Sequence, residues 1–230
     1  MTSVDALEAG EVQLRLAPLS MAAEELARVT AFLSEEELQR GRRLLAPERR
    51  DGFFAGRGIL RERLAGYLGE EPRLIRLSEG EFGKPRLSDH QGRDDLRFNV
   101  SHAADYLLMA FAAGREVGID LEQLRHDLPY RAMAERYFSL REREELLSLP
   151  EAEQIAGFYR CWTRKEAYMK ATGSGFSQSS TGFDVSLLPG QPPALLAHSS
   201  LPDEVGKWAI EDVTVPDGYC AALAIQNRKP

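Results

Sequence analysis

Three short apolar runs near the middle of the chain limit the fold more strongly than any other feature. They are LRFNVS (96–101), YLLMAFAA (106–113) and EVGIDLE (116–122), and only a few residues separate each run from the next. Each run has the length of a strand, and the gaps between the runs are short enough to be turns. The sequence therefore predicts consecutive antiparallel strands at the centre of the fold.

Helical patterns and further strands lie on both sides of these runs. Before them we predict a strand at 12–18, a helix from Ser20 to about Phe32, a helix with the capping box Ser34–Glu37, a helix from Pro47 and a strand around 73–77. After them we predict helical structure over 129–149 with a capping box at Ser139, a helix over about 152–171 that ends before Gly173, and strands around 182–188, 193–198, 206–213 and 218–225. This order of elements is typical of the α+β class with antiparallel sheets.

A weak internal repeat indicates two similar halves. The segments DYLLMAFA (105–112) and GYCAALAI (218–225) share a turn residue, a tyrosine and a strand of small apolar residues. Each segment closes one half of the chain, and both halves place helices before strands. We therefore predict an N-terminal α+β subdomain, 1–115, and a C-terminal α+β subdomain, 116–230, without the flexible linker that independent domains need.

The composition excludes several classes of protein. The chain has 230 residues, of which 43% are hydrophobic and 28% charged, an ordinary balance for a soluble globular protein. No apolar run is long enough to span a membrane, the N-terminus does not have the pattern of a secretory signal, and the two cysteines lack metal-binding spacing. These features predict a cytoplasmic protein. The formal net charge of −7 argues against nucleic acid as the main partner.

An arginine-rich segment, from Arg40 to Arg63, contrasts with the acidic whole. One interpretation is a solvated helical face, and the other is a surface that binds an anion such as a nucleotide phosphate. The net charge of the chain does not separate these two interpretations.

Asp120 and Glu122 are the first candidates for chemistry. Residues i and i+2 of a strand point to the same face, so these two carboxylates share a face while their apolar neighbours turn to the core. Two adjacent carboxylates repel each other unless water, a proton or a cation compensates their charge. The pair therefore indicates either an exposed strand end or a site for a hard cation such as Mg²⁺.

The segment FYRCWTRKEAYMKATGSGF (158–176) supplies the next candidates. In a helix, Trp162, Glu166 and Lys170 are spaced i, i+4 and i+8, so they lie on one stripe beside the apolar face. Glu166 and Lys170 alone would be an ordinary helix ion pair of small energy. Their place at the border of the buried face also suits a functional role.

Ser101 and His102 lie at the end of the strand predicted at 96–101, and Lys84 lies in the turn GKP. A lone histidine is more often structural than catalytic, and neighbouring serine and histidine residues do not easily form a nucleophilic pair. Contact with a phosphate group suits Ser101 and His102 better. The segment GEFGKP lacks the spacing of a P-loop, so it predicts a turn.

Four motifs occur in order along the chain: GKP (83–85), FNVSH (98–102), GIDLE (118–122) and WTRKEAYMK (162–170). This set resembles the 4′-phosphopantetheinyl transferases of the Sfp type. The resemblance implies two similar α+β halves related by a pseudo-twofold axis, with the active site at their interface. It implies an enzyme that uses Mg²⁺ to transfer 4′-phosphopantetheine from coenzyme A to a serine of an apo acyl or peptidyl carrier protein, and releases adenosine 3′,5′-bisphosphate. A monomer would carry the whole site.

The resemblance also assigns roles to individual residues. It implies that the metal ligands are Asp120, Glu122 and Glu166. It implies catalytic roles for Glu166, Glu122 and Lys170, with Glu166, or Glu122 through a water molecule, as the general base. It implies that coenzyme A is contacted by Arg40, Lys84, Ser101, His102, Lys165 and Lys170, and that Glu37 replaces a second lysine of the family pattern.

Two other functions stay open at this point. A non-catalytic module that binds coenzyme A would need Lys84 and His102 but not three acids. A metal-dependent phosphohydrolase would need the acids but no surface for a carrier protein. The products formed from coenzyme A, with and without a carrier, distinguish these alternatives from the transferase.

Overall fold

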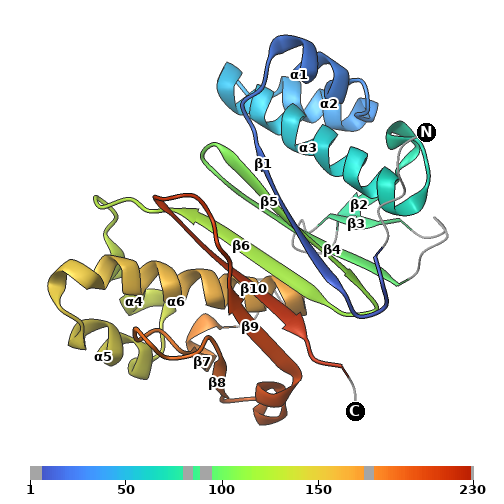
Figure 1. Ribbon diagram of the computed structural model, residues 1–230. Coiled ribbons are helices and arrows are strands. Elements are labelled where there is room, and N and C mark those ends of the chain that lie inside the picture. The colour runs from blue at the N-terminus through green and yellow to red at the C-terminus, as the bar shows by residue number, and fades with distance from the viewer. Residues whose placement is uncertain (1–6, 80–84, 89–94, 174–178, 229–230) are drawn as a thin grey trace.

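Figure 1 shows the fold in a computed structural model, which describes residues 7–79, 85–88, 95–173 and 179–228. The strands are β1 (Val12–Pro18), β2 (Leu77–Glu79), β3 (Pro85–Leu87), β4 (Leu96–Ala103), β5 (Tyr106–Ala113), β6 (Val117–Gln123), β7 (Phe183–Val185), β8 (Leu195–His198), β9 (Trp208–Asp212) and β10 (Tyr219–Gln226). The α-helices are α1 (Ala23–Thr30), α2 (Glu35–Arg42), α3 (Pro47–Leu68), α4 (Tyr130–Tyr137), α5 (Leu140–Ser148) and α6 (Glu151–Thr172). None of the helices in these ranges is long and apolar enough to cross a membrane.

Two antiparallel sheets form the centre of the molecule. The first sheet has the order β1-β5-β4 and the second has the order β6-β10-β9. In each half, one helix of 22 residues covers its sheet, α3 in the first half and α6 in the second. This arrangement confirms the predicted α+β class with antiparallel sheets and two similar halves. The subdomain boundary between 115 and 116 stays a prediction.

Side chains on opposite faces of the central strands belong to different hydrophobic clusters. On β5, Met109 and Phe111 join the cluster that packs against α3, whereas Leu108 and Ala110 join a cluster shared with the second sheet. Ile119 of β6 belongs to that same shared cluster. Because both faces of β5 are buried, its sequence is a continuous apolar run and does not alternate with polar residues.

Three of the predicted helix starts are confirmed, and one is wrong. The capping boxes at Ser34 and Ser139 are both present, and α3 begins at Pro47 as predicted. The prediction for Ser20 is wrong, because α1 begins at Ala23 and Ala22 takes the cap position without a side-chain hydrogen bond. Met21 packs against the first core instead, so the chain enters the helix later.

The helical stretch predicted over 129–149 is divided in two. Helix α4 ends at Tyr137, Phe138 adopts an extended conformation with its side chain buried, and Ser139 then caps α5. The apolar contact of Phe138 with Phe158, at 5.2 Å between ring centroids, accounts for this break. A buried aromatic side chain stabilises the turn more than one further helical residue would.

Gly118 permits the close contact between β6 and α6. A Cβ atom at this position would overlap the carbonyl oxygen of Ala167 and the backbone nitrogen of Ala171. Backbone atoms cannot turn away as a flexible side chain can, so a larger residue must push α6 off the strand. The glycine of the GIDLE motif therefore fixes the distance between the strand and the helix that carry the candidate site.

We expect the substitution Gly118→Ala to lower the free energy of unfolding by about 3 kcal/mol, at the upper end of the usual cost of overpacking. Urea unfolding followed by circular dichroism measures this change. Gly52→Ala is a suitable control, because a Cβ atom at Gly52 meets nothing within 4 Å and alanine favours the helix. An equal stability for Gly118→Ala and wild type would contradict the proposed role of the close contact.

Candidate active site

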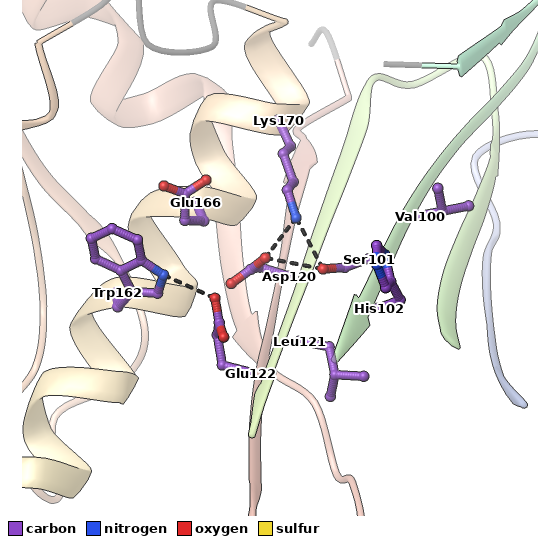
Figure 2. A pocket seen from close by; sticks show the side chains of 9 residues that line it. All are labelled: Val100, Ser101, His102, Asp120, Leu121, Glu122, Trp162, Glu166 and Lys170. Carbon is purple, nitrogen blue, oxygen red and sulfur yellow. Dashed lines mark hydrogen bonds and ion pairs between the residues drawn. The ribbon is translucent and has the colours of Figure 1, made fainter. Parts of the chain in front are cut away.

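One pocket lies between strands β4 and β6 and helix α6, as Figure 2 shows. Its lining residues are Val100, Ser101, His102, Asp120, Leu121, Glu122, Trp162, Glu166 and Lys170. Three motifs that are far apart in the sequence therefore meet at one place: FNVSH, GIDLE and WTRKEAYMK. The helical stripe predicted from the spacing of Trp162, Glu166 and Lys170 faces this pocket.

The two strands of the pocket come from different sheets and are held together by side chains. The backbone N–H of Ile119 donates a hydrogen bond to Oδ1 of Asn99 at 2.7 Å, and the hydroxyl of Ser101 donates one to Oδ1 of Asp120 at 3.1 Å. Asn99 is 2% exposed, and the sequence analysis did not select it. A polar residue inside a strand that is otherwise buried was the available signal, because a buried amide needs hydrogen-bond partners.

Asp120 is the most strongly constrained acid of the pocket. Its side chain is 4% exposed, and Oδ1 accepts a hydrogen bond from Nζ of Lys170 at 2.6 Å as well as the bond from Ser101. The ammonium group of Lys170 also donates to the Ser101 hydroxyl oxygen at 3.0 Å. The other carboxylate oxygen, Oδ2, is buried and has no hydrogen-bond partner among the described residues. Such an oxygen is available to a ligand that fills the pocket.

Burial and mutual repulsion raise the pKa values of the two neighbouring acids. Glu122 has a raised pKa, first because it is buried and second because Asp120 is negative nearby, while a hydrogen bond from Nε1 of Trp162, at 3.1 Å, acts in the opposite direction. The pKa of Glu166 is raised to about 7, again by burial and then by the charge of Asp120. Lys170 lowers both pKa values but does not compensate the repulsion.

The acids fit a hard cation by their chemistry, although they are not gathered around one point. Across the described residues, no three histidine, cysteine, aspartate or glutamate side chains are grouped closely enough to hold a metal ion in their present positions. Lys170 holds one oxygen of Asp120, and Trp162 holds Glu122. The three carboxylates nevertheless line one pocket, offer only oxygen atoms and repel each other, which is the donor set that Mg²⁺ prefers.

Ser101 and His102 lie where the sequence placed them, at the end of β4 and in the wall of the pocket. His102 is exposed in part, and both the partial burial of its side chain and the positive charge of Lys170 lower its pKa. A lowered pKa favours the neutral imidazole at neutral pH. A neutral His102 can still donate one hydrogen bond to an anion that enters the pocket.

Lys165 lies in the core, away from the pocket. Its side chain is 2% exposed, and Nζ donates hydrogen bonds to both carboxylate oxygens of Glu142, at 2.8 and 2.7 Å, and to the carbonyl oxygen of Phe183 at 2.6 Å. These bonds use all three donors of the ammonium group. Lys165 is not among the residues that line the pocket, so its contact with coenzyme A stays a prediction that the geometry does not support. We assign it to the core beneath α6 instead.

Two further contacts of coenzyme A were predicted, Arg40 and Lys84. Arg40 is exposed on α2, with its guanidinium 5.8 Å from the ring centroid of Phe53, and it is not part of the pocket lining. Lys84 lies outside the described residues, so its role stays a prediction. Glu37 completes the cap of α2 and accepts a hydrogen bond from Arg61 at 2.7 Å. Arg61 is 3% exposed, so within the arginine-rich segment it lies neither on a solvated face nor on a surface that could bind an anion.

Comparison with known proteins shows the family of the chain. Residues 116–224 match the family model of the 4′-phosphopantetheinyl transferase superfamily, and residues 20–114 match that of the 4′-phosphopantetheinyl transferase N-terminal region. The chain is 39% identical to the 4′-phosphopantetheinyl transferase HetI of Nostoc sp. (strain PCC 7120) over 94% of this chain and 87% of HetI. It is 31% identical to the transferase Sfp of Bacillus subtilis (strain 168) over 90% of this chain and 87% of Sfp. The chain therefore belongs to the 4′-phosphopantetheinyl transferase superfamily and is an enzyme of that kind.

Proposed function

We propose that the pocket between β4, β6 and α6 transfers the 4′-phosphopantetheinyl group of coenzyme A to a serine hydroxyl of an apo carrier protein. The other product is adenosine 3′,5′-bisphosphate. One observation supports this site above all: three carboxylates and one lysine, brought by two motifs, line a single pocket in a transferase of this family. We also propose a monomer as the active form, because strand β4 of the first half and elements β6 and α6 of the second half line the pocket together.

Mg²⁺ is the metal that we propose for this pocket, held by Asp120, Glu122 and Glu166. When bound, it would neutralise the charge of the diphosphate and of the phosphoryl group in transfer. The buried Oδ2 of Asp120, which has no partner among the described residues, supports Asp120 as the principal ligand. Burial first and the charge of Asp120 second raise the pKa values of the other two acids, and a bound cation would relieve the repulsion between the carboxylates.

The side chains of the pocket supply the other parts of the reaction. Lys170 is the one lysine or arginine in the described lining, so its ammonium group would bind the phosphate oxygens and the charge that the leaving phosphate gains. His102 and Ser101, on the opposite wall, would bind a further phosphate group of coenzyme A. A carboxylate must accept the proton of the carrier serine as its oxygen attacks phosphorus, and Glu166 and Glu122 are both candidates.

The test is an incubation of the purified chain with coenzyme A, Mg²⁺ and a panel of apo carrier proteins of fatty-acid, polyketide and peptide pathways. We expect intact mass spectrometry to show that at least one carrier gains phosphopantetheine. We also expect a metal chelator to abolish the gain and added Mg²⁺ to restore it. Bound coenzyme A without any gain across the panel would favour the non-catalytic module. Breakdown of coenzyme A without a carrier would favour the phosphohydrolase.

The hydrogen bond from Trp162 to Glu122 leads to a second prediction. Trp162→Phe removes the N–H donor but keeps an aromatic ring to pack against Phe158, whose centroid lies 5.8 Å away. We expect kcat to fall about tenfold with little change in melting temperature, because a hydrogen bond to a charged group contributes about 1.5–3 kcal/mol. If Trp162 acts through Glu122, adding Trp162→Phe to the Glu122→Gln variant should lower kcat little further. Independent, multiplicative losses in the double variant would argue against this positioning role.

A further inference from the structure

Lys170 is bound to the residue that we propose as the principal metal ligand. Its side chain crosses from α6 to β6, as Figure 2 shows, and its Nζ lies 2.6 Å from Oδ1 of Asp120. Asp120 is almost fully buried, whereas the Lys170 side chain is 29% exposed. A buried carboxylate needs a compensating charge, and the ammonium group of Lys170 provides it here.

We propose that Lys170 is an internal counter-ion that pairs with Asp120 in the metal-free enzyme and is displaced when the metal binds. This inference rests on the metal site of the proposed function. In this exchange the divalent cation takes over the compensation of the buried Asp120 carboxylate. The ammonium group leaves Asp120 and becomes available to the phosphate groups of the substrate. The metal-free pocket is thus kept folded by a residue that later takes part in binding.

Electrostatics favours the exchange, because two cations on one buried carboxylate group repel each other. An ammonium group at 2.6 Å from Oδ1 and a divalent ion on the same group would lie a few ångströms apart and repel each other. The repulsion is strong because Asp120 is 4% exposed and water screens it poorly. The hydrogen bond from Lys170 to Ser101 would break in the same movement, and the Ser101 hydroxyl would keep its own bond to Asp120.

The side chain of Lys170 has the properties that such a movement requires. It is long and flexible, it starts from the last turns of α6, and its partial exposure leaves it a path into the open part of the pocket. Arginine or a short side chain would not combine these properties, because the guanidinium group is rigid and a short chain does not reach Asp120. A lysine therefore suits a position where the charged group changes partners when the metal binds.

The experiment compares Mn²⁺ binding by the full chain and by Lys170→Met, without coenzyme A, using the electron paramagnetic resonance signal of free Mn²⁺. Methionine keeps the length of the side chain and removes its charge and its donors. We expect Lys170→Met to bind Mn²⁺ at least about tenfold more tightly, which corresponds to about 1.4 kcal/mol. Lys207→Met is the matched control, because Lys207 is paired with Glu204 outside the pocket and its removal changes the net charge equally. Its affinity for Mn²⁺ should equal that of wild type.

A second measurement follows the lysine directly in the wild-type chain, so it does not depend on the folding of a variant. In ¹⁵N spectra, a lysine ammonium group held by hydrogen bonds is protected from rapid proton exchange with water. We expect one such signal, absent in Lys170→Met, to disappear or shift when Mg²⁺ is added.

Equal or weaker Mn²⁺ binding by Lys170→Met, or a Lys170 signal that Mg²⁺ leaves unchanged, would overturn the exchange while the transferase function stands. If wild type and Lys170→Met both fail to bind Mn²⁺, the metal assignment and the exchange are overturned together. The carrier assay tests transfer separately, so the failure of the proposed function is distinguishable from the failure of this inference.

Discussion

The substitution Asp120→Asn is expected to reduce kcat for phosphopantetheinyl transfer by about 100-fold to 1,000-fold, the range seen when one preorganised electrostatic group of an active site is lost. Asparagine has the same shape, and its oxygen can still accept hydrogen bonds from Lys170 and Ser101. It lacks the negative charge that the proposed metal ion requires. The rate of holo-carrier formation, measured by mass spectrometry at saturating coenzyme A, gives the comparison.

The controls for Asp120→Asn separate chemistry from folding. Circular dichroism should show the same helix and strand content as wild type, because the substitution removes no packing contact. Glu211→Gln changes an exposed acid on β9, in the same sheet but outside the pocket, and should leave kcat unchanged. Glu166→Gln should also lose most of its activity. Near-normal rates for both Asp120→Asn and Glu166→Gln would rule out the proposed metal site.

The residues that could be predicted correctly from sequence are those whose signals are local. A capping box needs only residues i and i+3, and both predicted boxes are present. The stripe of Trp162, Glu166 and Lys170 needs only the helical period, and all three residues line the pocket. That this stripe lies beside Asp120 was predicted only from the resemblance of the motifs to a known family. No periodicity in the sequence places a strand and a helix about 40 residues apart side by side.

The features that the sequence does not reveal are contacts between distant parts of the chain. Lys165 is adjacent to Glu166, but consecutive helical residues point in directions about 100° apart, so the two side chains face different surroundings. Its partner Glu142 lies 23 residues earlier, and nothing in the local sequence pairs them. Asn99 was overlooked for the same reason, since its partner is a backbone N–H of a strand in the other sheet.

The substitution Glu142→Ala is expected to lower the free energy of unfolding by about 3–5 kcal/mol, because it leaves the buried charge of Lys165 without a partner. Glu142 is fully buried, and its carboxylate also accepts hydrogen bonds from the backbone N–H groups of Ser139 and Val185. One side chain thus joins α5, β7 and α6, and its loss affects all three. Urea unfolding followed by circular dichroism measures the change.

The double variant Glu142→Leu with Lys165→Met distinguishes the buried charge from the other contacts of this pair. Apolar residues of similar size often replace a buried ion pair at little cost, so the double variant should regain much of the stability that Glu142→Ala loses. Because Lys165 does not line the pocket, the KM for coenzyme A in this variant should stay close to the wild-type value. A KM raised tenfold or more in a stably folded double variant would restore Lys165 as a contact of coenzyme A. An unchanged KM would confirm that the KEA motif combines one residue for packing, Lys165, with one for the site, Glu166.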